Sequence, residues 1–491
     1  MYYPTLEETL NLSSEGNLIP ISRDVDADLE TPVSAYLKVA NMPYSFLLES
    51  VEGGEHIARY SFIGTEPERV ITTGMDYPDG EIDPLIRIQD VFAEYKLIDT
   101  GNLPKFSGGV VGYLSYEVSK YFENIPAPTV DALKLPESIL MLVKTFLIFD
   151  HVAHKIQVVS HADLSDGVEV GYEQAVSRID AIVNKLNKPL DPVSIKKTSG
   201  FTKGPTLSNM KPDYHKFMVE KCKEHVVAGE VIQTVVSQRF SRQTSADAFH
   251  IYRSLRAVNP SPYMYFLDLG DFQIVGASPE MLVRVQNGLV TTHPIAGTRP
   301  RASDEDEDKR LELELKSDEK ERAEHIMLLD LGRNDLGRVC KPGTVSVKQI
   351  MEIERYSHVM HLVSHVEGEL DEGRTNYDAF RACFPAGTVS GAPKIRAMEL
   401  IADLEVDKRG PYAGAVGYFD FAGNMDTAIA IRTLVIKDGI AYAQAGGGIV
   451  YDSKPEVEYD ETVHKSGALM RAIDKAEDNL EVVDKENDTS D

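Results

Sequence analysis

The sequence predicts an α+β protein in which strands and helices follow one another without a regular order. Residues 36–159 hold short runs of apolar and β-branched residues between Gly, Pro and Asp turns, as is typical of successive strands. From residue 213 to residue 476, strand-like and helix-like segments alternate irregularly, which argues against the βαβ rhythm of a doubly wound sheet. The 491 residues are enough to bury a large core, in one large or two moderate domains.

The first region, residues 1–187, is predicted to be mostly strands. Its strand-like runs are 44–50, 108–116, 140–150 and 154–160, and one helix is expected over residues 168–186. Residues 188–212, with several Pro, Ser, Thr and Lys, form the predicted linker.

The second region, residues 213–476, is predicted to begin with a helix at 213–228 that Gly229 ends, followed by a strand at 231–240. The last segment, residues 477–491, is polar and acidic, so a disordered tail is expected there.

The charge and cysteine content limit the possible partners and location. With 78 acidic and 51 basic residues the net charge is −27, whereas nucleic acids and anionic membranes need a basic footprint. Cys222, Cys340 and Cys383 lie far apart, which indicates free thiols in a reducing compartment. The N-terminus lacks a basic and apolar leader, and no apolar run has membrane-spanning length. We therefore expect a cytoplasmic protein.

Two acidic segments are candidate metal sites. In the predicted helix that Ser317 would cap, Glu321 and Glu324 share one face, and carboxylates so placed can hold Mg²⁺. A solvated charged face is the alternative, but the apolar run from Ile326 indicates that the helix turns inward. Glu461 begins a second helix with Lys465 one turn on, where a surface ion pair is the simpler interpretation.

Arg432 lies in a predicted strand, residues 427–436, that is apolar on both faces. A buried guanidinium needs an anion, which is either a structural carboxylate or a ligand carboxylate held in a bidentate grip. Three loops with glycine allow a ligand close to the backbone, although tight turns also explain them: Gly297 with Thr298, Ala386 to Thr388, and Gly446, Gly447 and Gly448.

The segment from Ser390 to Lys394 has the features of an anion-binding helix start. Ser390 is the expected N-cap and Pro393 suits the first turn of a helix that continues to Leu404. The open N–H groups of this helix would face the loop before it, although an ordinary capped helix has the same pattern.

Two residues are candidates for proton transfer. His361, on a predicted strand over 357–364, is either a core histidine or a base at a carbon centre. Glu280 is either a turn carboxylate or a buried general acid.

Seven ordered motifs resemble those of the chorismate-utilising enzymes, and among these most closely the large subunits (component I) of anthranilate synthase. The resemblance covers nearly all of residues 213–476, and so many motifs in order are highly specific. They are PIAGTRPR (294–301), DEKERAEHIMLLDLGRNDLGRVC (318–340), YSHVMHLVS (356–364), PAGTVSGAPKIRAMELI (385–401), AIRTLVI (430–436), QAGGGIVYDS (444–453) and DETVHKS (460–466).

This resemblance implies a fold of antiparallel sheets with flanking helices and two intimately packed regions. It also implies conversion of chorismate and ammonia to anthranilate and pyruvate by a Mg²⁺-dependent lyase. Catalytic roles are implied for His361, Glu280 and Thr388, and metal ligation for Glu324 and Glu461. The implied substrate contacts are Gly297, Thr298, Tyr412, Arg432, Gly446, Gly447, Gly448 and Lys465, with Glu321 in support.

Two positions distinguish relatives within the resembled family. Gln233 stands where isochorismate synthases carry a lysine, and Ala296 stands where many aminodeoxychorismate synthases carry one. Ammonia as the nucleophile and C2 as the point of attack are therefore favoured. The alternatives are an aminodeoxychorismate synthase component I and a catalytically silent, tryptophan-sensing scaffold.

The resemblance further implies a tryptophan feedback site and a partner subunit. Ser50, with Pro262, Tyr263 and Met264, matches the tryptophan site, although a strand end and a Pro-rich turn also explain these residues. None of the three cysteines lies in the Gly-x-Cys-x-Gly elbow of an amidotransferase, so the implied ammonia source is a separate glutamine amidotransferase subunit, component II.

Overall fold

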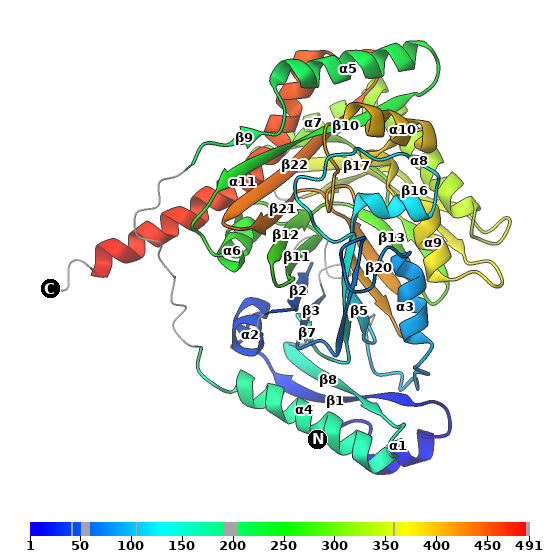
Figure 1. Cartoon of the computed structure of the whole chain (residues 1–491), viewed down its shortest axis with the longest axis vertical. Helices are drawn as coiled ribbons and strands as arrows, with labels where there is room; N and C mark the ends of the chain where they lie inside the picture. The colour runs from blue at the N-terminus through cyan, green and yellow to red at the C-terminus, as the bar shows by residue number, and fades with distance from the viewer. Residues whose placement is uncertain (41–42, 51–58, 105, 191–203, 357–358, 488–491) are drawn as a thin grey trace.

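The computed structural model describes residues 1–40, 43–50, 59–104, 106–190, 204–356 and 359–487, with side chains described up to 478. Two large sheets form its centre, and the pairings between their neighbouring strands are antiparallel. Helices cover their outer faces (Figure 1). The predicted α+β fold is confirmed, whereas most of the predicted linker, 191–203, lies outside the described residues.

The larger sheet has twelve strands and joins both regions of the chain. Its order is β1-β8-β7-β3-β2-β11-β12-β21-β22-β10-β18, with β9 on β10. In this order the strands are Leu18–Asp26, Lys155–Asp163, Thr145–Asp150, Tyr60–Thr65, Ser45–Glu49, Tyr263–Asp268, Phe272–Ser278, Thr433–Lys437, Ile440–Ile449, Gln233–Gln243 and Gly391–Ala392, and β9 is Leu207–Ser208.

The ten-stranded sheet also joins the two regions, through the pairing of β5 with β19. Its order is β15-β17-β14-β13-β20-β19-β5-β6-β4, with β16 on β17. In this order the strands are Ile295–Pro300, Val359–Glu369, Leu289–Thr292, Met281–Gln286, Met425–Ile429, Ala415–Asp420, Gly109–Leu114, Ser138–Val143 and Arg69–Thr73, and β16 is Ser346–Arg355.

The helices pack on the outer faces of the sheets and leave the space between them to a shared aromatic core. Phe46 and Tyr265 of the larger sheet and Tyr113 and Tyr418 of the other are buried in one common cluster. The helices are α1 Leu6–Leu12, α2 Pro32–Val39, α3 Pro84–Phe92, α4 Val168–Leu186, α5 Pro212–Val227, α6 Ala248–Val258, α7 Glu305–Ser317, α8 Glu319–Gly337, α9 Asn376–Cys383, α10 Lys394–Leu404 and α11 Pro455–Asn487, with 3₁₀ turns η1 Tyr116–Tyr121 and η2 Gly387–Val389.

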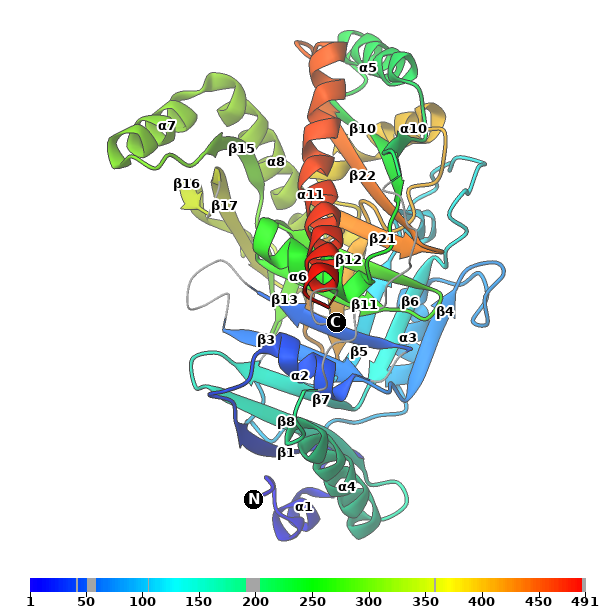
Figure 2. The ribbon, with the colours of Figure 1, turned by 90° about the vertical axis from the view of Figure 1, so that its left-hand side faces the viewer.

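Helix α11 runs along the face of the larger sheet and packs on β22, α5 and α6 (Figure 2). It continues to Asn487, past the predicted start of a disordered tail at Glu477. Glu477 accepts hydrogen bonds from Arg242 and Thr244, so tertiary contacts hold this part of the helix despite its acidic composition. Residues 488–491 lie outside the described residues.

Two predicted strands are each divided between the sheets. The run 140–150 breaks at Lys144, so that β6 lies in one sheet and β7 in the other. The run 427–436 breaks in the same way into β20 and β21. Each break falls at a charged residue, Lys144 or Arg432, but the segments on either side are apolar, so the sequence pattern predicts one strand. Within the described residues, no helix has the length and apolar character needed to cross a bilayer.

Candidate active site

A cavity of about 400 Å³, here the charged cavity, gathers nearly all the predicted site residues. Its wall is built by strands of both sheets together with α8, η2 and α11. Among the residues with implied catalytic, substrate or metal roles, Gly447 alone does not line it. Those that do are Glu280, Gly297, Thr298, Glu324, His361, Thr388, Tyr412, Arg432, Gly446, Gly448, Glu461 and Lys465, together with Glu321, Gln233 and Ala296.

Glu280 follows β12 and is 8% exposed. Its carboxyl accepts a hydrogen bond of 2.8 Å from the Thr388 hydroxyl. Burial raises the pKa of Glu280 to about 8, against the lowering effects of the Thr388 hydrogen bond and of the Lys465 charge. Glu280 therefore carries a proton at neutral pH and can act as a general acid.

His361 lies on β17 opposite Thr298 of β15. Its Nδ1 is 3.0 Å from the Gly297 carbonyl oxygen and 3.0 Å from the Thr298 hydroxyl. Burial and the nearby Arg432 charge lower the pKa of His361, so the ring is neutral at pH 7. A neutral, fixed imidazole can accept a proton from a bound ligand.

Arg432 lies in the break between β20 and β21 and not inside a strand, which corrects the prediction of one strand over 427–436. Its φ angle of 51° is in the left-handed region that non-glycine residues rarely adopt. The Arg432 carbonyl accepts from Ala277 N, and its Nη1 donates to the Lys465 carbonyl at 2.7 Å. The break turns this guanidinium into the cavity.

Four carboxylates line the cavity from two helices. Glu321 and Glu324 project from α8, and Glu458 and Glu461 project from α11. Burial raises the pKa of Glu324 and of Glu458, and a neighbouring carboxylate adds to each shift. Glu458, 7% exposed, was missed from the sequence, although Glu458 and Glu461 repeat the i, i+3 spacing of Glu321 and Glu324.

This donor set fits a hard cation such as Mg²⁺, which prefers oxygen ligands and needs one or two protein carboxylates. Burial is the main cause of the raised pKa of Glu324, and a divalent ion would relieve the additional repulsion from Glu321. Among the described residues no three His, Cys, Asp or Glu side chains form a ready-made metal cluster. Glu461 instead pairs with Lys465 at 2.6 Å.

The three glycines at 446–448 form part of β22 and not a loop after it, which corrects the prediction. A side chain at Gly446 would lie 2.8 Å from the Tyr412 hydroxyl, and one at Gly448 would overlap the Gln233 amide. These glycines therefore keep the cavity open beside Tyr412. Gly297 lies in a bulged part of β15 with a φ of 71°, where a side chain would meet Leu315 and Glu321.

The predicted anion-binding helix start is not part of the cavity. Ser390 does not cap α10, because its hydroxyl donates to the Ala386 carbonyl at 2.8 Å, and the residue before the helix is Pro393. Residues 390–396 are absent from the cavity lining. Ser317 likewise ends α7, and Asp318 caps α8.

A buried arginine behind the cavity was also missed. Arg409 donates to both carboxylate oxygens of Glu405 and to the carbonyls of Val235 and Val389, which line the cavity. Its guanidinium lies 5.6 Å from the centre of the Tyr412 ring. It thereby ties β10, η2 and Tyr412 together.

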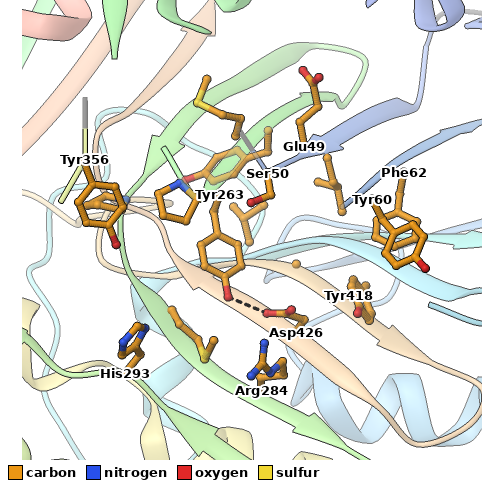
Figure 3. Close-up of a pocket in the computed structure, with 18 residues that line it drawn as sticks. Glu49, Ser50, Tyr60, Phe62, Tyr263, Arg284, His293, Tyr356, Tyr418 and Asp426 are labelled. Atoms are coloured by element: carbon orange, nitrogen blue, oxygen red, sulfur yellow. Dashed lines mark hydrogen bonds between the residues drawn. The ribbon is translucent and has the colours of Figure 1, made fainter. Parts of the chain in front are cut away.

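A second cavity of about 120 Å³, here the aromatic cavity, is lined by the residues that were predicted to bind tryptophan (Figure 3). Ser50 at the end of β2 and Pro262, Tyr263 and Met264 at the start of β11 all line it. The Tyr263 hydroxyl points at Asp426 and donates to it at 3.0 Å. The other aromatic and charged residues of its wall are Glu49, Tyr60, Phe62, Tyr265, Arg284, His293, Tyr356 and Tyr418.

Comparison with known proteins gives one consistent relationship. Residues 44–471 match the family model of the chorismate binding enzymes. The chain is 46% identical to anthranilate synthase component 1 of Acetivibrio thermocellus, over 97% of this chain and 99% of that protein. It is 47% identical to anthranilate synthase component 1 of Mycobacterium tuberculosis, over 95% of each chain.

Solved structures agree with the sequence relatives. Anthranilate synthase component I from Streptococcus pneumoniae superposes with a TM-score of 0.77 at 39% identity, covering 91% of this chain and 98% of that one. The menaquinone-specific isochorismate synthase of Escherichia coli has a TM-score of 0.71 at 18% identity, over 95% of this chain and 98% of that one, which supports the shared fold alone.

Proposed function

This chain belongs to the chorismate-binding enzymes, and on that premise we propose that it acts as the large subunit of an anthranilate synthase. It would convert chorismate and ammonia to anthranilate and pyruvate as a cytoplasmic lyase of tryptophan biosynthesis. The observation that carries the proposal is the charged cavity, which sets Arg432 and backbone groups of Gly297 and Gly446 beside a cluster of carboxylates. A small dianion with a bound cation suits that arrangement.

Glu324 and Glu461 would hold Mg²⁺, with Glu321 and Glu458 beside them. When bound, the ion neutralises a substrate carboxylate and orients the ring. Arg432 would grip a second carboxylate, and the Tyr412 hydroxyl and Lys465 would complete the substrate contacts.

In the first step the ammonia nitrogen bonds to ring C2 and the C4–O bond breaks. Glu280, protonated at neutral pH, gives its proton to the leaving hydroxyl, which departs as water, and the added nitrogen releases a proton. Thr388 holds the Glu280 carboxyl in place through its hydroxyl.

In the second step neutral His361 removes the C2 proton. The electron pair of the C2–H bond completes the aromatic ring, the C3–O bond breaks, and enolpyruvate takes up a proton to become pyruvate. The Gly297 carbonyl and the Thr298 hydroxyl fix the orientation of the imidazole.

The test is to incubate the purified chain with chorismate, MgCl₂ and an ammonium salt, and to identify the product by fluorescence and mass. We expect anthranilate. 4-Amino-4-deoxychorismate would instead favour the aminodeoxychorismate synthase alternative, and no product would favour the silent scaffold. With glutamine in place of ammonium we expect product only after a glutamine amidotransferase subunit is added.

We also propose that the aromatic cavity binds L-tryptophan as a feedback inhibitor. Tyr60, Phe62 and Tyr418 supply ring surfaces, and Asp426 and Arg284 supply opposite charges for an amino acid. Pro279 lines both the aromatic and the charged cavity, so a ligand in one is one residue from Glu280 in the other. Saturating tryptophan that leaves chorismate affinity and turnover unchanged would refute this.

A further inference from the structure

A third cavity, here the side cavity, lies against the charged cavity and has a volume of about 50 Å³. Glu280, Leu328 and Thr388 line both cavities, so they form the wall between them. The rest of the side cavity is lined mainly by α8, the start of η2 and the ends of β13 and β14. Its volume suits one or two molecules the size of water, and it excludes a six-membered ring.

Two polar groups in the side cavity, the Thr292 hydroxyl and His293 Nε2, have no hydrogen-bond partner within the described part of the chain. Thr292 is 7% exposed. His293 Nε2 lies 3.4 Å from a carboxylate oxygen of Glu354. Asp335 and Thr388 are engaged, because Asp335 binds Lys394 at 2.9 Å and Thr388 donates to Glu280. A buried hydroxyl left unpaired is costly, so a small hydrogen-bonding ligand would stabilise it.

The charges around the side cavity favour a neutral ligand. Asp335 is buried and already holds the Lys394 ammonium, and burial keeps Glu280 protonated at neutral pH. A bound cation would therefore lose its hydration without gaining a free carboxylate. Apolar contacts come from Leu282, Leu331 and Ile429.

We propose that the side cavity is the binding site for neutral ammonia, from which the nucleophile passes the Glu280–Thr388 wall to the bound ring. This inference rests on the proposed function, which requires ammonia as second substrate but gives it no site. The nucleophile then reaches the ring beside Glu280, the wall residue that also protonates the leaving hydroxyl.

Gly332 on α8 allows the side cavity to be narrowed selectively. A methyl group there would lie 3.3 Å from the Thr292 hydroxyl and 3.4 Å from Pro294. Because alanine is a better helix former than glycine, Gly332→Ala is not expected to unfold the protein. Gly337→Ala at the end of the same helix meets nothing within 4 Å and is the matched control.

With ammonium salts as the nitrogen source, Gly332→Ala is expected to raise the KM for ammonia about three- to tenfold, the loss of roughly one hydrogen bond. The KM for chorismate and kcat at saturating ammonium should stay as in the unchanged enzyme, and Gly337→Ala should alter nothing. Thr292→Val, which removes the hydroxyl and keeps the volume, should raise the KM for ammonia by a similar factor without lowering Tm.

Each outcome separates this proposal from the proposed function. If the unchanged enzyme does not aminate chorismate, the proposed function fails. If the unchanged enzyme does aminate chorismate, two results would show that the side cavity is not the ammonia site. Either Gly332→Ala and Thr292→Val both keep the original KM for ammonia, or they raise the KM for ammonia and the KM for chorismate together. Measuring the KM between pH 6 and 7.5, where Glu280 keeps its proton, checks the ligand's charge, since a site for neutral ammonia gives one KM when concentrations are expressed as NH₃.

Discussion

The charged and aromatic cavities differ in how the chain builds them. The aromatic cavity is formed largely by side chains on regular strands, with Ser50 and Tyr263 near the paired ends of β2 and β11. The charged cavity depends on irregular backbone: the left-handed Arg432, the bulge at Gly297 and the glycines of β22. Strained or side-chain-free positions are thus concentrated where a ligand must approach the backbone closely.

The cavities also differ in electrostatics, although Pro279 lines both. The charged cavity has five glutamates, which are Glu280, Glu321, Glu324, Glu458 and Glu461, facing Lys320, Arg432 and Lys465. The aromatic cavity is lined mainly by rings and few charges. Substitutions should therefore separate the two functions, with catalysis failing in one set of variants and tryptophan response in the other.

The largest separation is expected for His361→Gln. Loss of the imidazole base should lower anthranilate formation by about 10²–10⁴-fold, because the C2 proton is no longer removed. The aminated intermediate that still carries the enolpyruvyl group should accumulate and be detected by mass. Tryptophan binding, measured by calorimetry, should be unchanged, and equal loss of the intermediate and of anthranilate would contradict this role for His361.

Glu324→Gln should lower kcat/KM for chorismate by about 100-fold or more and raise the Mg²⁺ concentration needed for half-maximal rate. The matched control is Glu319→Gln, an exposed residue on the first turn of the same helix, which should leave both values within about twofold. Steady-state rates across a MgCl₂ titration provide the measurement. A slower enzyme whose Mg²⁺ requirement is unaltered would argue against metal ligation by Glu324.

Motif residues were predictable from the sequence because their identity alone carried the signal. Arg432, Glu324 and His361 were all found, and they all line one cavity. The backbone around Arg432 was not predictable, because β20 and β21 are both mainly apolar and the sequence pattern includes the single charged residue between them in one continuous strand. The same reason explains the missed break at Lys144.

Long-range partners were the second kind of information that the sequence lacked. Glu458 could have been predicted, because it lies three residues before Glu461 on the same helix. Nothing near Arg409 in the sequence indicated that it would bind the carbonyls of Val235 and Val389. Gly446 and Gly448 were expected in a turn, since glycine is commonest there. In the structure their role is set by Tyr412 and Gln233, which are distant in sequence.

A smaller effect is expected in the aromatic cavity, where a substitution should weaken tryptophan binding and leave catalysis unchanged. Tyr60→Leu removes one ring of its wall and should raise the Kd for tryptophan about two- to tenfold, with chorismate kinetics unchanged. Tyr77→Leu, a tyrosine outside both cavities, is the control. Calorimetry would give the Kd for tryptophan, and inhibition curves would give the tryptophan concentration that inhibits the enzyme. A matching change in the KM for chorismate would show that the two cavities are not separable at this residue.

The smallest effect is expected from Thr388→Val, which leaves every charge in place. The Thr388 hydroxyl lowers the pKa of Glu280, so its loss should raise that pKa above about 8. Because Glu280 acts in its protonated form, the fall of kcat/KM at alkaline pH should move to higher pH, while the rate at pH 7 drops only about two- to tenfold through poorer positioning. A pH–rate profile from 6 to 10 provides the measurement. A shift to lower pH would mean that Glu280 works as a carboxylate, and the assignment of the acid would have to pass to another group in the charged cavity.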